Sequence, residues 1–90
     1  MDKTLQEKME QKLSEIFSKT DEVQSTVDSL GNLAGDKKSF GYGIVIGGLY
    51  NSFYYQSRRI LKRNPTDEEF SDFLALIKNH ESDFEKNLKS

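Results

Sequence analysis

A repeating apolar pattern in the first third of the chain constrains the fold more than any other feature. Seven positions follow one another at alternating spacings of four and three residues: Met9, Leu13, Ile16, Thr20, Val23, Val27 and Leu30. This is the a/d spacing of a coiled coil, kept for three heptads with Thr20 as its one polar member. No glycine or proline interrupts residues 3–30. The pattern therefore predicts one long helix over about residues 3–30, roughly 40 Å in length.

The apolar seam of this helix must pack against another apolar surface, and two arrangements are possible. The seam can fold back on the rest of the chain as an intramolecular bundle, or it can pair between chains. The predicted helix is roughly 10 Å longer than either later helix. We therefore expect part of it to pack within the chain and the rest to pair with a second copy, most simply as a dimer. Six seam residues would carry this association: Met9, Leu13, Ile16, Val23, Val27 and Leu30.

A glycine-rich segment, residues 31–43, is predicted to be a loop. Gly31 follows the last seam residue, where a glycine often ends a helix. The segment lacks the GxxxxGK[ST] order of a phosphate-binding loop. Helical apolar spacing then predicts a second helix over about residues 44–63. Whether residues 42–47 are helical or extended stays open, because glycine alternates there with β-branched residues.

The segment Asn64-Pro65-Thr66 marks the clearest boundary in the chain, because the residue before a proline disfavours helix. Thr66 and Glu69 form a capping-box pattern that predicts a third helix over about residues 66–88. So short a connection predicts that the second and third helices form an antiparallel helical hairpin. Residues 1–90 are thus expected to be a single all-α domain of three helices. A long coiled-coil-like N-terminal helix precedes the hairpin, and self-association completes the fold.

Composition narrows the class of protein. The chain has 90 residues, of which 34% are hydrophobic and 31% charged, so its core must be thin. It has no cysteine, which excludes disulfides and thiolate metal sites. Small secreted domains usually depend on disulfides, so a cytoplasmic location is expected. No apolar run approaches the roughly 20 residues that a membrane-spanning helix needs.

The sequence offers no constellation typical of an enzyme. His80 is the only histidine, and no cysteine or second histidine stands at a metal-ligand spacing from it. General-base catalysis would need a nucleophile or a paired acid beside it, and none can be placed. We therefore expect no catalytic residue, no metal and no cofactor.

The charge is distributed unevenly along the chain. Residues 1–30 hold four Lys/Arg against seven Asp/Glu, residues 31–63 six against one, and residues 64–90 three against seven. The basic middle segment places four residues on one helical face: Tyr55, Arg58, Arg59 and Lys62. Arginine beside an aromatic ring can stack on bases and contact phosphates. The favoured interpretation is simpler: these cations offset the helix dipole and face the acidic start of the next helix.

Two functions follow from these patterns. The first is a noncatalytic structural or adaptor module that self-associates through its N-terminal helix and can bind a further protein. The alternative is a small nucleic-acid-binding or regulatory protein that uses the basic face defined above, helped by Lys37 and Lys38.

Overall fold

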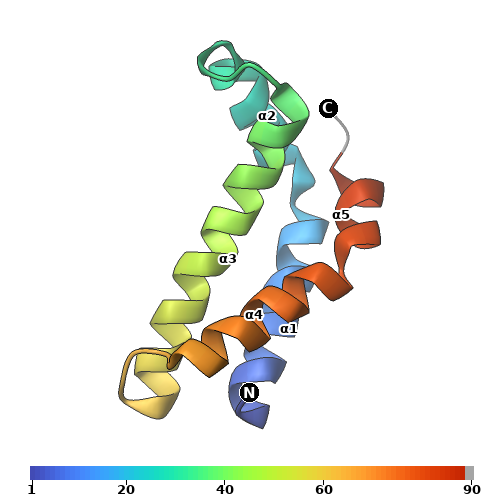
Figure 1. The fold of residues 1–90 in the computed structure, drawn as a ribbon. Helices are drawn as coiled ribbons and strands as arrows, with labels where there is room; N and C mark the ends of the chain where they lie inside the picture. Colours follow the sequence, from blue (N-terminus) through green and yellow to red (C-terminus); the bar gives the residue numbers. More distant parts are fainter. Residues whose placement is uncertain (89–90) are drawn as a thin grey trace.

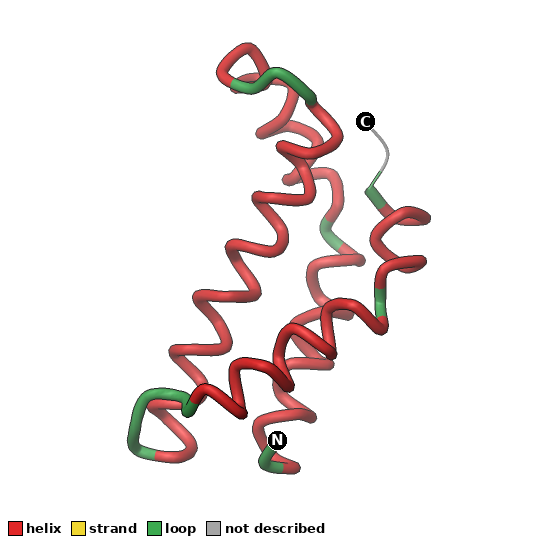
Figure 2. Tube along the Cα trace, viewed as in Figure 1, coloured by secondary structure: helices red, strands yellow, loops and turns green. Residues whose placement is uncertain are grey.

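The structure, a computed structural model, describes residues 1–88, and nearly all of them are helical. The helices are α1 Lys3–Ser18, α2 Thr20–Leu30, α3 Lys37–Leu61, α4 Asp67–Asn79 and α5 Glu81–Asn87. A 3-10 turn, Gly31–Leu33, follows α2. Residues 1–88 contain no strand (Figure 2). The predicted all-α class is therefore confirmed.

The helices are arranged around the longest one. α1 and α2 run antiparallel to α3, and α4 leaves the turn at the end of α3 and crosses α1 (Figure 1). α5 then turns back toward the α2 end of the molecule. The Met1 amino group lies 2.8 Å from the Asp72 carboxylate and so ties the start of the chain to α4. The connection after α3 is short, as predicted, but α4 runs obliquely rather than along α3.

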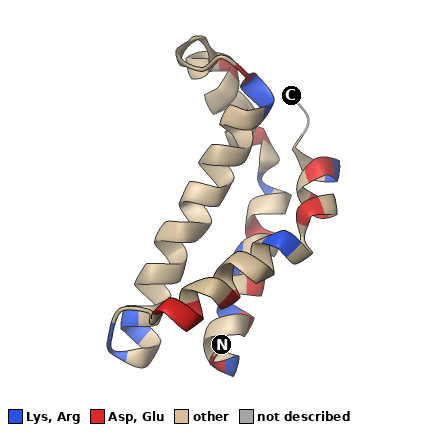
Figure 3. Cartoon of the chain, viewed as in Figure 1, with Lys and Arg blue, Asp and Glu red and all other residues tan. Residues whose placement is uncertain are grey.

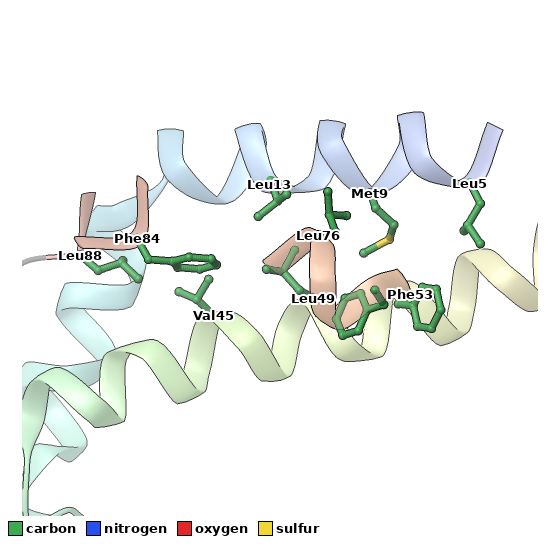
Figure 4. Packing of buried hydrophobic residues seen from close by; sticks show 10 residues of the cluster. Leu5, Met9, Leu13, Val45, Leu49, Phe53, Leu76, Phe84 and Leu88 are labelled. Atoms are coloured by element: carbon green, nitrogen blue, oxygen red, sulfur yellow. The ribbon is translucent and has the colours of Figure 1, made fainter. Parts of the chain in front are cut away.

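One apolar core lies between α1, α3 and the α4–α5 pair (Figure 4). Its buried residues are Leu5, Met9, Leu13, Val45, Leu49, Phe53, Phe73, Leu76, Phe84 and Leu88. The Phe53 and Phe73 rings stack with their centroids 4.6 Å apart. The core thus joins the first and last thirds of the chain through α3.

The predicted single helix over residues 3–30 is wrong in one respect, because it breaks at Lys19. The Ser18 hydroxyl donates to the Glu15 carbonyl oxygen at 2.7 Å. In a continuous helix the Lys19 N–H would bond to that carbonyl, but here it bonds to Ile16 O at 3.0 Å. Side-chain hydroxyls compete with the helical ladder in this way. The break divides the seam between α1 and α2.

The predicted glycine-rich loop over residues 31–43 is also too long, because α3 begins at Lys37 rather than near residue 44. The Asp36 carboxylate caps this start: Oδ1 accepts from the Lys38 N–H at 3.0 Å, and Oδ2 accepts from the Ser39 hydroxyl at 2.8 Å. An N-cap of this kind stabilises a helix by about 1 kcal/mol. Residues 42–47 are helical, which answers the question left open by the sequence.

In the turn between α3 and α4, the predicted N-terminal cap of the next helix is present. The Thr66–Glu69 capping box is present and opens α4. α3 ends at Leu61, and Lys62 adopts the left-handed conformation with φ 62° and ψ 27°.

Gly31 follows the end of α2, as predicted, but it has φ −59° and does not end the helix in the left-handed conformation. Its lack of a side chain makes room for Lys37, whose Cε would lie 3.1 Å from a Cβ built on Gly31.

The predicted third helix over residues 66–88 is interrupted at His80. The His80 N–H bonds to Ile77 O at 3.0 Å, and its ring Nδ1 lies 2.9 Å from the Asp83 carboxylate. The break redirects the chain so that Phe84 reaches the core, where its ring meets that of Phe17 edge-on at 5.1 Å. A straight helix along α4 would carry Phe84 past this site.

Candidate interaction surface on helix α3

The apolar seam predicted for self-association lies mostly inside the molecule. Met9 and Leu13 are buried in the core, and Ile16 and Val23 pack against it half-buried. Val27 is buried as well and lies beside Gly41 of α3. Leu30 is the one seam residue that is clearly exposed, at 48%. Most of the seam therefore packs within the chain, largely against α3.

A different surface without a covering within residues 1–88 is the side of α3 turned away from the core. We call it the outward face of α3, and it consists of Phe40, Gly43, Ile44, Gly47, Tyr50, Asn51 and Tyr54. These residues are exposed or half-buried, and Tyr54, at the edge of the face, also packs against the core. No charged residue occurs among the 19 positions of residues 39–57. Along α3 the basic residues gather only at the two ends, and the length between them is uncharged (Figure 3).

An uncharged, solvent-facing helix surface is unusual in this protein. Charged residues make up 31% of the chain, and the outer side of α1 carries Lys3, Glu7 and Glu10, all exposed. A surface helix normally presents such residues to water. Depletion of charge with retention of tyrosine is typical of the centre of a protein interface. The uncharged run of residues 39–57 is the signal in the sequence that could have identified this face.

At three positions of α3, no contact within the described part of the monomer requires a glycine. A Cβ built on Gly43, Gly47 or Gly48 would meet no atom within 4 Å in the described part of the chain, apart from its neighbours in the chain and the backbone of its own helix. Each glycine inside a helix costs about 1 kcal/mol relative to alanine. Gly43 and Gly47 lie one turn apart on the outward face and leave a shallow bare stretch of backbone. Such a stretch allows another helix to approach closely.

Aromatic side chains border this bare stretch. Tyr50 is 43% exposed, and its ring centroid lies 4.9 Å from that of Tyr54 and 6.2 Å from that of Phe70. These contacts hold the Tyr50 ring in place without covering it. Rigid tyrosines that expose an apolar face and a hydroxyl are common anchors in protein interfaces.

Three residues of the predicted basic face, Tyr55, Arg58 and Arg59, lie on the last turns of α3, whereas Lys62 follows the end of the helix in the left-handed conformation. Tyr55 is 58% exposed, and Arg58, Arg59 and Lys62 are exposed beside it. None of the three cations forms an ion pair with a carboxylate of residues 1–88.

The predicted pairing of this basic segment with the start of α4 is limited to one ion pair within residues 1–88. Arg63 donates to both carboxylate oxygens of Glu69, at 2.6 and 3.1 Å. Arg58 instead donates to the side-chain oxygen of Asn64 at 3.4 Å. Arg58 and Arg59 do lie in the last turn of α3, where cations offset the helix dipole, and α4 begins with Asp67, Glu68 and Glu69 as expected. Direct pairing across the turn is limited to Arg63 and Glu69 within residues 1–88.

The described part of the chain holds no group of three or more His, Cys, Asp or Glu side chains placed to bind a metal ion. None of its helices is long and apolar enough to cross a membrane. Comparisons of the chain with protein-family models, curated proteins and solved structures found no match.

Proposed function

We propose that the protein is a noncatalytic structural or adaptor module that associates with a second copy of itself through the outward face of α3. The observation that carries the proposal is the exposed, uncharged length of α3 with glycines that the monomer does not use. This keeps the self-association expected from the sequence and moves it from the N-terminal seam to α3.

Charge complementarity favours an antiparallel pair of α3 helices centred on Gly47. A two-fold axis at Gly47 brings together residues equally distant from it in opposite directions. Asp36 lies eleven residues before Gly47 and Arg58 eleven residues after it. Both are exposed, and hydrogen bonds led by the Ser39 hydroxyl lower the pKa of Asp36. Each end of the pair would therefore place a carboxylate opposite a guanidinium.

Side-chain size is complementary in the same register. Gly43 lies opposite Asn51, and Tyr50 lies opposite Ile44 of the second copy, beside the bare backbone at Gly43. α3 has 25 residues and spans the molecule, whose longest extent is 38 Å. A single helix pair is nevertheless a small interface, so we expect a dissociation constant of about 1–100 µM.

The test is a sedimentation series over protein concentration with two matched variants. Gly47→Glu places a charge at the centre of the proposed interface, whereas Gly48→Glu places the same charge about 100° around the helix. Both positions have open space in the monomer, so both variants should fold. Wild type and Gly48→Glu should dimerise, and Gly47→Glu should stay monomeric. A wild type that remains monomeric at the highest concentration would overturn the proposal, as would equal loss in both variants.

The basic face supports a second candidate function, binding of single-stranded nucleic acid. The supporting observation is that Arg58, Arg59 and Lys62 are exposed without carboxylate partners in residues 1–88, next to the exposed Tyr55. Phosphate contacts by these cations would make binding weaken with salt, and Tyr55 offers a ring for base stacking.

Substitutions at Arg59 and Lys62 distinguish nucleic-acid binding from dimerisation, because neither residue belongs to the charge pair proposed for the dimer. Arg59→Glu with Lys62→Glu should abolish oligonucleotide binding at low salt and leave the sedimentation unchanged. The control is Lys3→Glu with Lys78→Glu, which makes the same charge change elsewhere. No binding by the wild type at low salt would reject the candidate.

A further inference from the structure

A hollow of about 310 Å³ lies between α2, the first turns of α3 and the end of α5. It belongs neither to the outward face of α3 nor to the basic face. From its lining we propose that it binds a small amphipathic anion, a carboxylate head on a short apolar tail. The proposal is independent of the proposed self-association, because none of the residues that line the hollow belongs to that face.

The floor of the hollow is apolar. Val27 and Leu88 are buried, at 3% and 7% exposure, and Val23 is half-buried beside them. Gly41 also lines the hollow, and a Cβ built on it would lie 3.5 Å from Val27 Cγ2. A glycine at this position keeps the floor open where a larger side chain would fill it. A hydrated inorganic anion would leave this apolar surface uncovered, whereas an alkyl tail would cover it.

The rim of the hollow is cationic. Lys37 and Lys38 line it from the start of α3 and Lys86 from α5, whereas Asp21 is the one carboxylate that residues 1–88 contribute to the lining. None of the three lysines forms an ion pair within residues 1–88.

Two of these lysines are positioned by contacts of their own. The Lys37 alkyl chain passes close to Gly31, with Cε 3.1 Å from where a Cβ of Gly31 would be. The Lys38 ammonium lies 5.8 Å from the centre of the Tyr42 ring. The backbone N–H groups at the start of α3 already bond to Asp36, so the lysine side chains supply the positive charge.

The chemistry of the lining selects the ligand class. A volume near 310 Å³ is at the small end of the range for ligand sites. Among residues 1–88 the rim has three lysines and one carboxylate, so its net positive charge attracts an anionic head, and a short tail fits an apolar floor of this size. A monocarboxylate with a medium-length alkyl chain meets both conditions.

The experiment is an NMR titration of the full chain with three probes that separate head from tail: octanoate, inorganic phosphate and octanol. Octanoate should cause saturable shifts of the Val23, Val27 and Leu88 methyl signals, and neither other probe should do so at the same concentration. Lys37→Met with Lys86→Met should weaken octanoate binding at least tenfold. The control, Lys3→Met with Lys78→Met, makes the same change in net charge outside the hollow and should bind as the wild type does.

Several outcomes would overturn the proposal. Equal shifts with octanol would show that the lysines take no part, and equal shifts with phosphate would show that the floor takes none. Equal weakening by the control variant would assign the effect to net charge. Absence of saturable shifts with octanoate up to its solubility limit would dispose of the site altogether.

Discussion

The Arg63 guanidinium holds the Glu69 carboxylate through two hydrogen bonds, of 2.6 and 3.1 Å, across the turn between α3 and α4. The same carboxylate accepts from the Thr66 N–H at 2.8 Å, so it serves the capping box and the ion pair together. Glu69 is the point at which the basic end of α3 and the acidic start of α4 are joined. The hydrogen bonds from Arg63, followed by that from Thr66, lower the pKa of Glu69 from 4.5 to about 2.

This depressed pKa predicts a loss of stability in acid. Because the carboxylate is favoured in the folded state, its contribution is full above pH 4.5 and declines as the pH falls toward about 2. Urea unfolding between pH 7 and pH 2 should show this decline in wild type. Glu69→Gln should be less stable at pH 7 and show a smaller decline. Glu68→Gln is the control, because Glu68 forms no ion pair within residues 1–88. An unchanged pH profile in Glu69→Gln would contradict the assignment.

A buried hydroxyl predicts a stabilising substitution. Ser57 is fully buried in α3, and its Oγ has no hydrogen-bond partner among residues 1–88. Removing an unpaired buried hydroxyl, together with alanine's higher helix propensity, should raise the free energy of unfolding by about 1 kcal/mol. Ser57→Ala should therefore increase the melting temperature. Ser39→Ala is the opposing control, because the Ser39 hydroxyl donates to Asp36 at 2.8 Å and its loss should destabilise the protein. A lower melting temperature for Ser57→Ala would show that the hydroxyl is bonded.

The left-handed residue after α3 predicts a second stabilising substitution. Lys62 has φ 62°, a conformation that costs a residue with a Cβ about 1 kcal/mol and costs glycine little. Lys62→Gly should raise the free energy of unfolding, whereas Lys62→Ala should not, although both remove the charge. Equal effects of the two variants in urea unfolding would assign the change to charge and contradict the backbone argument.

Periodicity predicted the parts of the fold that depend on which residues are apolar. The all-α class, the burial of Met9 and Leu13 and the capping box at Thr66 follow from spacing alone. Spacing does not tell what covers an apolar face, so it could not show how much of the seam packs within the chain and how much is left for a second copy. In the structure most of the seam packs within the chain, and Leu30 is its clearly exposed member. The exposed positions of Tyr55, Arg58 and Arg59 were predicted, but their lack of carboxylate partners within residues 1–88 depends on side-chain geometry.

The errors in the helix boundaries arise from single side-chain hydrogen bonds. The hydroxyl of Ser18 takes the carbonyl that would have continued the first helix. The carboxylate of Asp36 starts α3 seven residues earlier than its glycines suggested. Asp36, followed by Ser39 three residues later, is a pattern that predicts a helix start. The glycines of the same segment predict a loop, and the loop prediction was preferred.

The bare glycines of α3 predict a stability effect that changes with protein concentration. Gly43→Ala with Gly47→Ala should stabilise the monomer by about 1 kcal/mol per site, because neither new Cβ meets another atom. In the proposed dimer the same methyl groups would hold the two helices apart and weaken association. The double variant should therefore melt above wild type in dilute solution, and the difference should shrink as concentration rises and wild type gains from dimerisation. Gly48→Ala, outside the interface, should keep its advantage at every concentration. A concentration-independent gain in the double variant would show that these glycines serve no partner.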